Sequence, residues 1–221
     1  QAIVSFRNSI SVQPNFPAFY NLGLAMQEQD KIDEAVTHYR KAVAINPNFV
    51  QVYNNLGNIF QKLNQFDQAV EYYKSAIQID PDNLEIQSNL GAIYIKTEKL
   101  DEAIHCYQHI LRINPNSFEA ENNLGSVYDR LYQMKKATNH YQRALQINPK
   151  YADAKNNMGL ILQRQNKFDK AIKYLTSVKD TYGEDELFKV NFETAEINCE
   201  WNEGLHQKNY IEGSYHLALC Y

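Results

Sequence analysis

Apolar residues recur along this chain at the three- and four-residue spacing of a helix, and the pattern is copied several times. In the stretch VQVYNNLGNIF, Val52, Leu56, Ile59 and Phe60 fall on one face, and Leu63 continues it. Residues three, four and seven positions apart share a face of an α-helix, so this spacing predicts an amphipathic helix. Asparagines fill the opposite face, although their amides compete for backbone hydrogen bonds and disfavour helix interiors. Their recurrence there calls for an explanation.

Small and aromatic residues show that the pattern has a period of 34 residues. Glycine recurs at this interval, at Gly23, Gly57, Gly91, Gly125 and Gly159. Alanine follows twelve residues later, at Ala35, Ala69, Ala103, Ala137 and Ala171. An aromatic residue comes four positions further on, at Tyr39, Tyr73, Tyr107 and Tyr141, with Leu175 in the last copy. Proline closes four copies, at Pro47, Pro81, Pro115 and Pro149, with Gly183 in the fifth place. A fixed period of this length indicates a tandem repeat.

Each copy predicts two helices joined by a turn. The second helix is expected to begin near an aspartate that caps its free amides, because short polar side chains accept these hydrogen bonds. These aspartates are Asp33, Asp67, Asp101 and Asp169, and Lys135 breaks the pattern in the fourth copy. The helix should end before the proline, which disfavours a helical conformation in the preceding residue. Glycine inside a helix costs roughly 1 kcal/mol relative to alanine, so its recurrence predicts a close approach of the two helices.

The signature of L-G, an aromatic residue three positions later, A-x3-F and a proline resembles the tetratricopeptide repeat family. LGNIF…AVEYY…P and its copies carry it. The resemblance implies an all-α fold, a right-handed α-solenoid of helix–turn–helix repeats. Residues 16–185 are expected to form five repeats, at 16–49, 50–83, 84–117, 118–151 and 152–185. We interpret 1–15 as the second helix of a partial repeat and 186–221 as an irregular partial repeat that continues the solenoid. The chain is therefore expected to be a piece of a larger protein or complex.

One asparagine position is filled in every repeat, two residues before the glycine: Asn21, Asn55, Asn89, Asn123 and Asn157. The resemblance implies that this face lines a concave groove, which Asn54, Asn58, Asn122 and Asn156 share. An amide carries both a donor and an acceptor, so a ladder of amides can pair with the backbone of an extended peptide. Here the array is similar to those of O-linked N-acetylglucosamine transferase and kinesin light chain. The alternative is codon bias from an AT-rich genome with a merely solvated face, but bias alone would scatter the asparagines.

Charged residues mark both ends of the first helices. Lys62, Lys96, Arg130 and Arg164 lie at the C-terminal ends of four of them, and Glu28 takes this place in the first repeat. Glu85, Glu119 and Asp153 lie at N-terminal ends. Two readings stay open: a groove with a basic and an acidic edge, or complementarity to the helix dipoles.

A carboxylate clamp of the chaperone-binding kind is not expected. In the family such a clamp needs lysine or arginine at the places held here by Tyr20, Asn54, Ser88, Asn122 and Asn156, or at the ladder asparagines. None of these residues is basic, so binding of a chaperone tail through such a clamp is disfavoured.

Composition narrows the class of partner. Net charge is −4 over 221 residues, which gives no basic surplus for nucleic acid. No apolar run approaches the roughly 18 residues of a membrane span. Three widely spaced cysteines, Cys106, Cys199 and Cys220, disfavour a disulfide framework, so a reduced, intracellular and cytoplasmic location is expected.

Catalytic and metal-binding patterns are weak. His105 and His109 lie one helical turn apart with Cys106 between them, but no third ligand follows at a conventional spacing, and exposed polar surface on the outer helix is the preferred interpretation. Cys199 and His206 are no stronger, and Trp201 is interpreted as a core anchor. With no phosphate loop, nucleophile elbow or paired-carboxylate motif, we expect no metal, no cofactor and no enzymatic activity.

Three functions follow. The preferred one is a non-enzymatic interaction scaffold that binds an extended segment of a partner protein in the groove. The second is the substrate-recruiting arm of a larger enzyme, such as a protein O-glycosyltransferase. The third is a structural subunit of a large trafficking or ciliary assembly.

Overall fold

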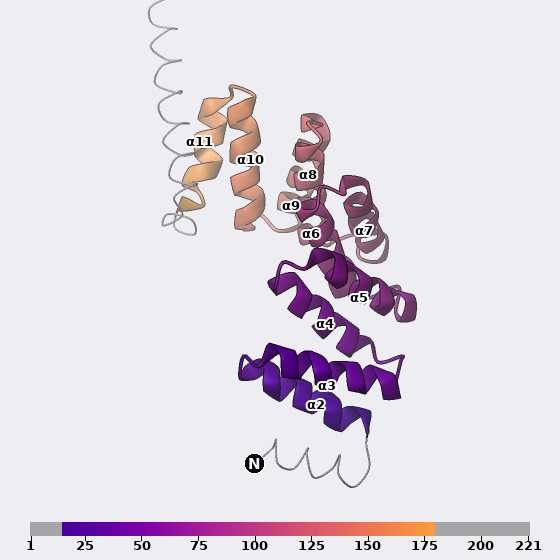
Figure 1. Ribbon diagram of the computed structural model, residues 1–221. Helices are drawn as coiled ribbons and strands as arrows, with labels where there is room; N and C mark the ends of the chain where they lie inside the picture. The colour runs from indigo at the N-terminus through magenta and orange to yellow at the C-terminus, as the bar shows by residue number, and fades with distance from the viewer. Residues whose placement is uncertain (1–14, 180–221) are drawn as a thin grey trace, which may run out of the picture. The chain divides into compact units, whose positions relative to one another are not determined.

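The computed structural model describes residues 15–179, which form helices joined by short turns (Figure 1). Nearly all of the two predicted partial repeats, at 1–15 and 186–221, lies outside the described residues, as do Cys199, Trp201, His206 and Cys220. Within 15–179, no helix is both long and apolar enough to cross a membrane.

The first of two units ends at Pro115, and its described part, 15–115, forms three helical hairpins. In each hairpin the first helix carries the recurrent glycine and the second helix carries the aromatic residue. Repeat 1 consists of α2 (Phe16–Glu28) and α3 (Ile32–Ile45), repeat 2 of α4 (Val50–Lys62) and α5 (Phe66–Ile79), and repeat 3 of α6 (Leu84–Lys96) and α7 (Leu100–Ile113). Each first helix packs on its own second helix, and α3 and α5 pack on the first helix of the next repeat. Both helices of an inner repeat thus bury their apolar faces against a neighbour.

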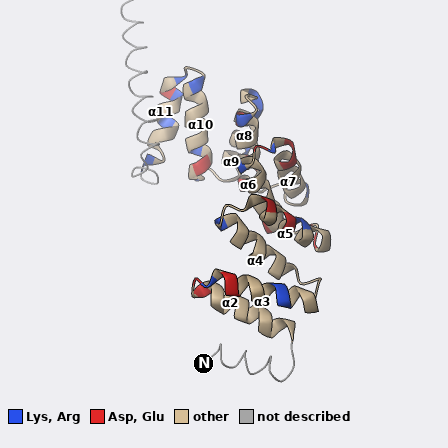
Figure 2. Ribbon diagram, in the orientation of Figure 1, with Lys and Arg blue, Asp and Glu red and all other residues tan. Residues whose placement is uncertain are grey.

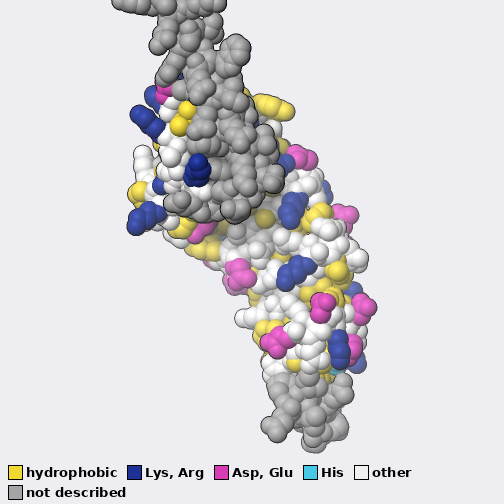
Figure 3. Space-filling view, turned by 90° about the vertical axis from the view of Figure 1, so that its left-hand side faces the viewer, with side chains coloured by type: hydrophobic (Ala, Val, Ile, Leu, Met, Phe, Trp, Pro, Cys, Tyr) yellow, Lys and Arg dark blue, Asp and Glu magenta, His cyan; other side chains and the backbone are white. Residues whose placement is uncertain are grey.

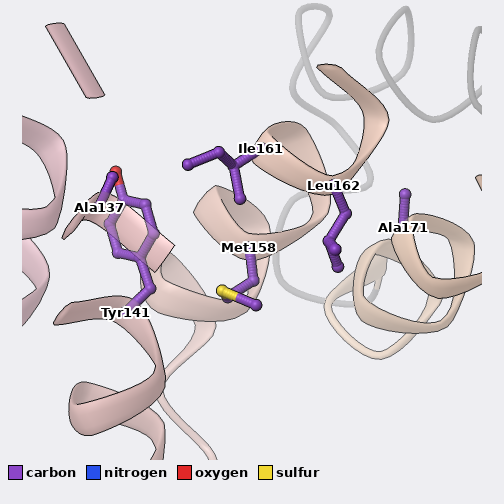
Figure 4. Packing of buried hydrophobic residues seen from close by; sticks show 6 residues of the cluster. All are labelled: Ala137, Tyr141, Met158, Ile161, Leu162 and Ala171. Atoms are coloured by element: carbon purple, nitrogen blue, oxygen red, sulfur yellow. The ribbon is translucent and has the colours of Figure 1, made fainter. Parts of the chain in front are cut away.

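The second unit begins at residue 116, and its described part, 116–179, forms two hairpins of the same kind. Repeat 4 consists of α8 (Phe118–Arg130) and α9 (Met134–Ile147), and repeat 5 of α10 (Ala152–Arg164) and α11 (Phe168–Thr176). α10 packs against α9 as well as α11. Figure 4 shows this junction: Met158 and Ile161 of α10 lie toward Tyr141 of α9, and Leu162 lies toward Ala171 of α11.

Glycine and tyrosine form the closest contact within a repeat. A Cβ atom added to Gly57 would lie 2.5 Å from Cε1 of Tyr73, and one added to Gly91 would lie 2.8 Å from Cζ of Tyr107. The recurrent glycine therefore makes room for an aromatic ring, which accounts for its presence inside a helix. In repeat 5, Gly159 faces the aliphatic side chain of Leu175 instead.

The four recurrent tyrosines are buried. Burial disfavours the charged phenolate, so it raises the pKa of the hydroxyl of Tyr39, Tyr73, Tyr107 and Tyr141 above its ordinary value. They remain neutral hydrogen-bonding groups under ordinary conditions.

The helix ends agree with the sequence prediction at the prolines and differ from it at the aspartates. The second helices of repeats 1 to 4 end at isoleucine, two residues before the proline, as expected. The predicted aspartate caps are wrong: α3 begins at Ile32 with Lys31 in the capping position and no side-chain cap, so Asp33 lies inside the first turn. The same offset applies to Asp67, Asp101 and Asp169. Their carboxylates face the positive end of the helix dipole, which explains their recurrence without a cap.

The turn between the two helices of each repeat contains one residue with a left-handed backbone. These residues are Asp30, Asn64, Glu98, Tyr132 and Asn166, with φ of 57° or 58°. Asparagine and aspartate tolerate this conformation, whereas a large aromatic residue is strained in it. Tyr132 is also 86% exposed, so no packing of its ring compensates for the strain.

Candidate functional site

The polar faces of the first helices form the candidate site, and we call them the amide face. In the first unit it comprises the polar positions of α2, α4 and α6, and in the second unit those of α8 and α10. All five ladder asparagines are half-buried, and each directly precedes a buried leucine or methionine. They therefore sit at the edge of the core, where only part of each amide reaches solvent.

Ladder asparagines donate to the preceding repeat. Nδ2 of Asn89 lies 3.4 Å from Oδ1 of both Asn54 and Asn58, and Nδ2 of Asn157 lies 3.0 Å from Oδ1 of Asn122. Asn55 instead donates to the hydroxyl of Tyr39, at 3.4 Å. These bonds fix the orientation of the amides, because a side chain held by a hydrogen bond loses rotational freedom.

Amides outside the ladder are also engaged. Nδ2 of Asn54 donates to Glu85 at 2.9 Å, so this glutamate binds the amide of the preceding repeat. Oδ1 of Asn156 is buried without a hydrogen-bond partner in the described part of the chain. Asn54 and Asn122, which hold the same place in repeats 2 and 4, use this oxygen to accept from a ladder amide. Asn21 and Asn123 are placed on the amide face by their helices but do not take part in these bonds.

Core tyrosines reach the amide face through their hydroxyls. Tyr39 donates to Oε1 of Gln27 at 2.9 Å, and the hydroxyl of Tyr73 lies 2.5 Å from Oδ1 of Asn58 and 2.9 Å from Oε1 of Gln61. Gln27 and Gln61 hold the same place, four residues after the glycine, and neither was singled out from the sequence as a partner of the core. The available signal was the pairing of glutamine with a tyrosine twelve residues later.

The charged residues differ between the units. Lys62 and Lys96 are exposed, and neither lies within ion-pair distance of a carboxylate in the described residues. In the second unit Arg164 forms two hydrogen bonds to Asp129, of 2.8 Å and 2.5 Å. Figure 2 shows the positive ends of α4, α8 and α10 and the negative end of the α2–α3 hairpin. The dipole reading explains the position of these cations, but it does not explain why only some are neutralised.

Two adjoining hollows lie on the first unit. One of about 430 Å³ is lined by Gln27, Asn58, Gln61, Lys62, Asn64, Asn89 and Lys96. The other, of about 480 Å³, is lined by Leu24, Gln27, Glu28, Asp30, Ile32, Ile59, Lys62 and Leu63. Only polar and charged residues line the first, whereas four of the eight residues that line the second are apolar. We call them the polar and the apolar hollow, and they share one glutamine and one lysine. Sequence reasoning placed the asparagines and lysines here, but it did not find the apolar hollow, because Leu24 and Leu63 look like ordinary core positions.

One face of the molecule carries a mixture of side chains (Figure 3). Positive, negative and apolar side chains alternate over short distances among uncharged polar atoms. Among the described residues visible on this face, the Lys and Arg side chains do not form one continuous patch.

A polar cluster joins the two helices of repeat 4. Glu121 of α8 is buried, and its carboxylate lies 2.6 Å from Nδ1 of His140 and 3.6 Å from Arg143, both on α9. The ring of His140 stacks on Tyr128 with centroids 5.2 Å apart. The imidazole of His140 and the guanidinium of Arg143 compensate the buried carboxylate, which would be costly if it were unpaired. This cluster lies between the two helices of repeat 4 and not on the amide face.

The histidines of α7 are only partly as predicted. His105 is exposed as expected, whereas His109 is half-buried, with Nε2 3.3 Å from Asp82 and Nδ1 3.0 Å from Arg112. Cys106 is buried, and burial raises the pKa of its thiol to about 12. Among the described residues, no group of three or more metal-ligating side chains is present.

Comparison with known proteins identifies the repeat. Models described as "Tetratricopeptide repeat" match 50–83, 82–150 and 132–189, and one described as "TPR repeat" matches 23–64. No curated protein matches the chain. The predicted similarity to O-linked N-acetylglucosamine transferase and kinesin light chain stays a prediction.

Solved structures share the fold. YrrB, titled a TPR protein with an unusual peptide-binding site, is 19% identical with a TM-score of 0.68, and the match covers 85% of this chain and 97% of that one. MamA from Desulfovibrio magneticus is 17% identical with a TM-score of 0.69, covering 77% and 97%. A tetratricopeptide repeat protein from Parabacteroides merdae is 18% identical with a TM-score of 0.74, covering 85% and 75%. The predicted all-α solenoid class is thereby confirmed.

Proposed function

We propose that this chain, which belongs to the tetratricopeptide repeat family, is an interaction scaffold whose amide face binds an extended segment of a partner protein. The observation that carries the proposal is the engagement of the ladder amides. In Asn89 the amide nitrogen donates to two neighbouring oxygens, so the side-chain carbonyl oxygen is the group left to meet a ligand.

A carbonyl oxygen held in a fixed direction is suited to accept from a peptide N–H. The amides are oriented before binding, so a partner would not have to bear the cost of ordering them. Asn157 is held in the same way by Asn122. Backbone recognition of this kind tolerates many sequences, since every residue except proline offers an N–H group.

The amide face also offers contact area beside the hydrogen bonds. The apolar hollow bounded by Leu24 and Leu63 adjoins the polar one, and Leu63 is 48% exposed. Binding sites combine an apolar surface with a few convergent polar groups, and the first unit presents both within adjoining hollows.

Replacement of Asn55, Asn89 and Asn123 by alanine tests the proposal. Peptides are first selected on the intact 221-residue chain from a phage-displayed random library. The triple variant should bind them about tenfold or more weakly, equivalent to ~1.4 kcal/mol, while thermal unfolding by circular dichroism stays cooperative.

A matched control changes three exposed amides on the second helices, Gln68, Gln108 and Gln142, to alanine. This control should leave peptide affinity unchanged. Equal affinity of the ladder variant and the wild-type chain would contradict the proposal, as would an equal loss in the control.

A further inference from the structure

The polar hollow of the first unit presents more hydrogen-bond donors than acceptors, although the side-chain oxygens of Asn64 and Asn89 also line it. The carbonyl of Gln27 accepts from Tyr39 at 2.9 Å. The carbonyl of Asn58 accepts from Tyr73 at 2.5 Å and from Asn89 at 3.4 Å. What these two amides still offer to a ligand is the N–H₂ group, which only donates.

Two ammonium groups complete this donor set. Lys62 and Lys96 line the same hollow, and a lysine ammonium carries three donors and no acceptor. No carboxylate lines the hollow, and no ion pair occupies either lysine within the described residues. A site made of ammonium and amide N–H groups is complementary to an anion.

The corresponding place in the second unit is already neutralised. Asp129 stands where repeat 2 has Gln61, four residues after the glycine, and Arg164 stands where repeat 3 has Lys96. These two side chains bind each other through two hydrogen bonds. A carboxylate in place of one amide therefore gives Arg164 an ion-pair partner, whereas Lys96 has no ion pair in the described residues and lies 5.8 Å from the ring centroid of Phe66.

The apolar hollow next to this site indicates what carries the anion. Leu24, Ile59 and Leu63 line it, and it shares Gln27 and Lys62 with the polar hollow. A free phosphate or a nucleic-acid backbone would leave this apolar surface in water, whereas a peptide side chain would bury it at about 25 cal/mol per Å². Glu28 and Asp30 also line the apolar hollow and disfavour a second anion there.

We propose that the first unit selects extended partner segments that carry one apolar and one acidic side chain. The apolar side chain enters the hollow at Leu24 and Leu63. The acidic side chain, which can precede or follow it in sequence, binds between Lys62 and Lys96. The apolar residue lies on the side of repeat 1 and the acidic residue on the side of repeats 2 and 3. Adjacent helices lie ~10 Å apart and an extended chain advances ~3.3 Å per residue, so the two side chains are about three residues apart. This inference rests on the proposed function and adds the chemistry of the partner.

The test measures fluorescence anisotropy of labelled peptides with the intact chain. The probe is a serine- and glycine-rich peptide with one leucine and, three residues away, a pair of glutamates, with an amidated C-terminus so that no terminal carboxylate takes part. Matched probes replace the glutamates by lysines or the leucine by glycine. The leucine–glutamate probe should bind about tenfold or more tightly than either.

The deciding variant is Gln61→Glu, which keeps an acceptor for Tyr73 and adds the negative charge that the second unit has at this place. It should weaken the leucine–glutamate probe about tenfold and leave the leucine–lysine probe unchanged or tighter. Gln163→Glu is the matched control in α10, at the same place in repeat 5, and should have no effect.

Other outcomes separate this inference from the proposed function. Library-selected peptides could bind the ladder variant more weakly and yet be neutral or basic, with the same affinity for Gln61→Glu as for the wild-type chain. That result would overturn this inference and leave the proposed function standing. If no peptide depends on the ladder, both fall. Tighter binding of labelled single-stranded DNA than of the leucine–glutamate probe, or competition by inorganic phosphate at equal concentration, would overturn a peptide as the source of the anion.

Discussion

The boundary between repeats 2 and 3 shares its ladder asparagine with the boundary between repeats 4 and 5. The charged residues beside this asparagine differ between the two boundaries. Both pairs have a ladder asparagine that donates across the repeat boundary, Asn89 to Asn54 and Asn157 to Asn122. In repeats 2 and 3 the neighbouring lysines form no ion pair among the described residues, and Lys96 lies over the ring of Phe66. In repeats 4 and 5, Asp129 binds Arg164. The framework that orients the amides is thus separate from the few positions that set the charge of the surface.

The contacts between the two helices of a repeat also differ from one repeat to another. Position 53 is tyrosine and position 87 is glutamine. In repeat 4 this place is taken by Glu121, which is buried and contacts His140 and Arg143. In repeat 5 the tyrosine that faces the glycine is replaced by Leu175. A repeat therefore tolerates different partners at one contact as long as the volume and the hydrogen bonds are satisfied.

The largest expected effect concerns the glycine contact. In Gly57→Ala the new methyl group would meet the buried ring of Tyr73, and overpacking of a core costs about 1–3 kcal/mol. The better helix propensity of alanine returns about 1 kcal/mol. We therefore expect a net loss of up to about 2 kcal/mol in the free energy of unfolding, measured by urea denaturation.

Gly159→Ala is the counterpart in the second unit. The methyl group would meet the side chain of Leu175, which can change rotamer more easily than a buried ring can move. The propensity gain of about 1 kcal/mol should then offset most of the loss. Equal destabilisation by the two substitutions would show that the rigidity of the aromatic ring is not the cause.

The next effect concerns the left-handed turn residue. Tyr132 holds a position at which repeats 2 and 5 have asparagine, and its ring is 86% exposed. A left-handed backbone costs a non-glycine residue about 1–2 kcal/mol, less for asparagine. Tyr132→Asn should therefore raise the free energy of unfolding by ~1 kcal/mol.

The reverse exchange, Asn64→Tyr in the first unit, should lower the stability by a similar amount. Neither side chain is buried, so neither exchange alters the core. A shift of the urea midpoint then reports the change in backbone strain. A stabilising effect of Asn64→Tyr would contradict the strain argument.

The smallest effect concerns the ion pair itself. A double-mutant cycle with Asp129→Ala and Arg164→Ala should give a coupling of about 0.2–1 kcal/mol, since exposed pairs are weak even with good geometry. The coupling should decrease at high salt. The same cycle at Gln61 and Lys96 should give none, and a coupling there equal to that of the second unit would contradict the difference between the two surfaces.

Much of this fold could be predicted from single residues. The glycine period located every described hairpin, and the isoleucine before each I-N-P or I-D-P motif located the helix end. The aspartate caps were wrong because a carboxylate at the first residues of a helix has two possible roles. An N-cap and a residue of the first turn differ by only two positions, and both satisfy the positive end of the helix.

The candidate site could be predicted in its residues but not in its bonds. Asparagine two residues before each glycine indicated a polar ladder, yet the sequence left each amide free to turn either way. The hydroxyl of Tyr73, on a different helix, lies at the carbonyls of Asn58 and Gln61. This contact could not be read from periodicity, which states what face a residue occupies and not which atom it meets.

The sequence by itself determined the repeat, its register, its recurrent glycines and tyrosines and the polar face of its first helices. The 34-residue period and the helical period can both be read from the order of residues alone. Only the tertiary structure decided which of the groups on that face remain available. Hydrogen bonds and ion pairs form over about 3 Å, and the packing of neighbouring helices sets such distances. The pairing of Asp129 with Arg164, and the absence of a carboxylate near Lys62 and Lys96 in the polar hollow, depend on it.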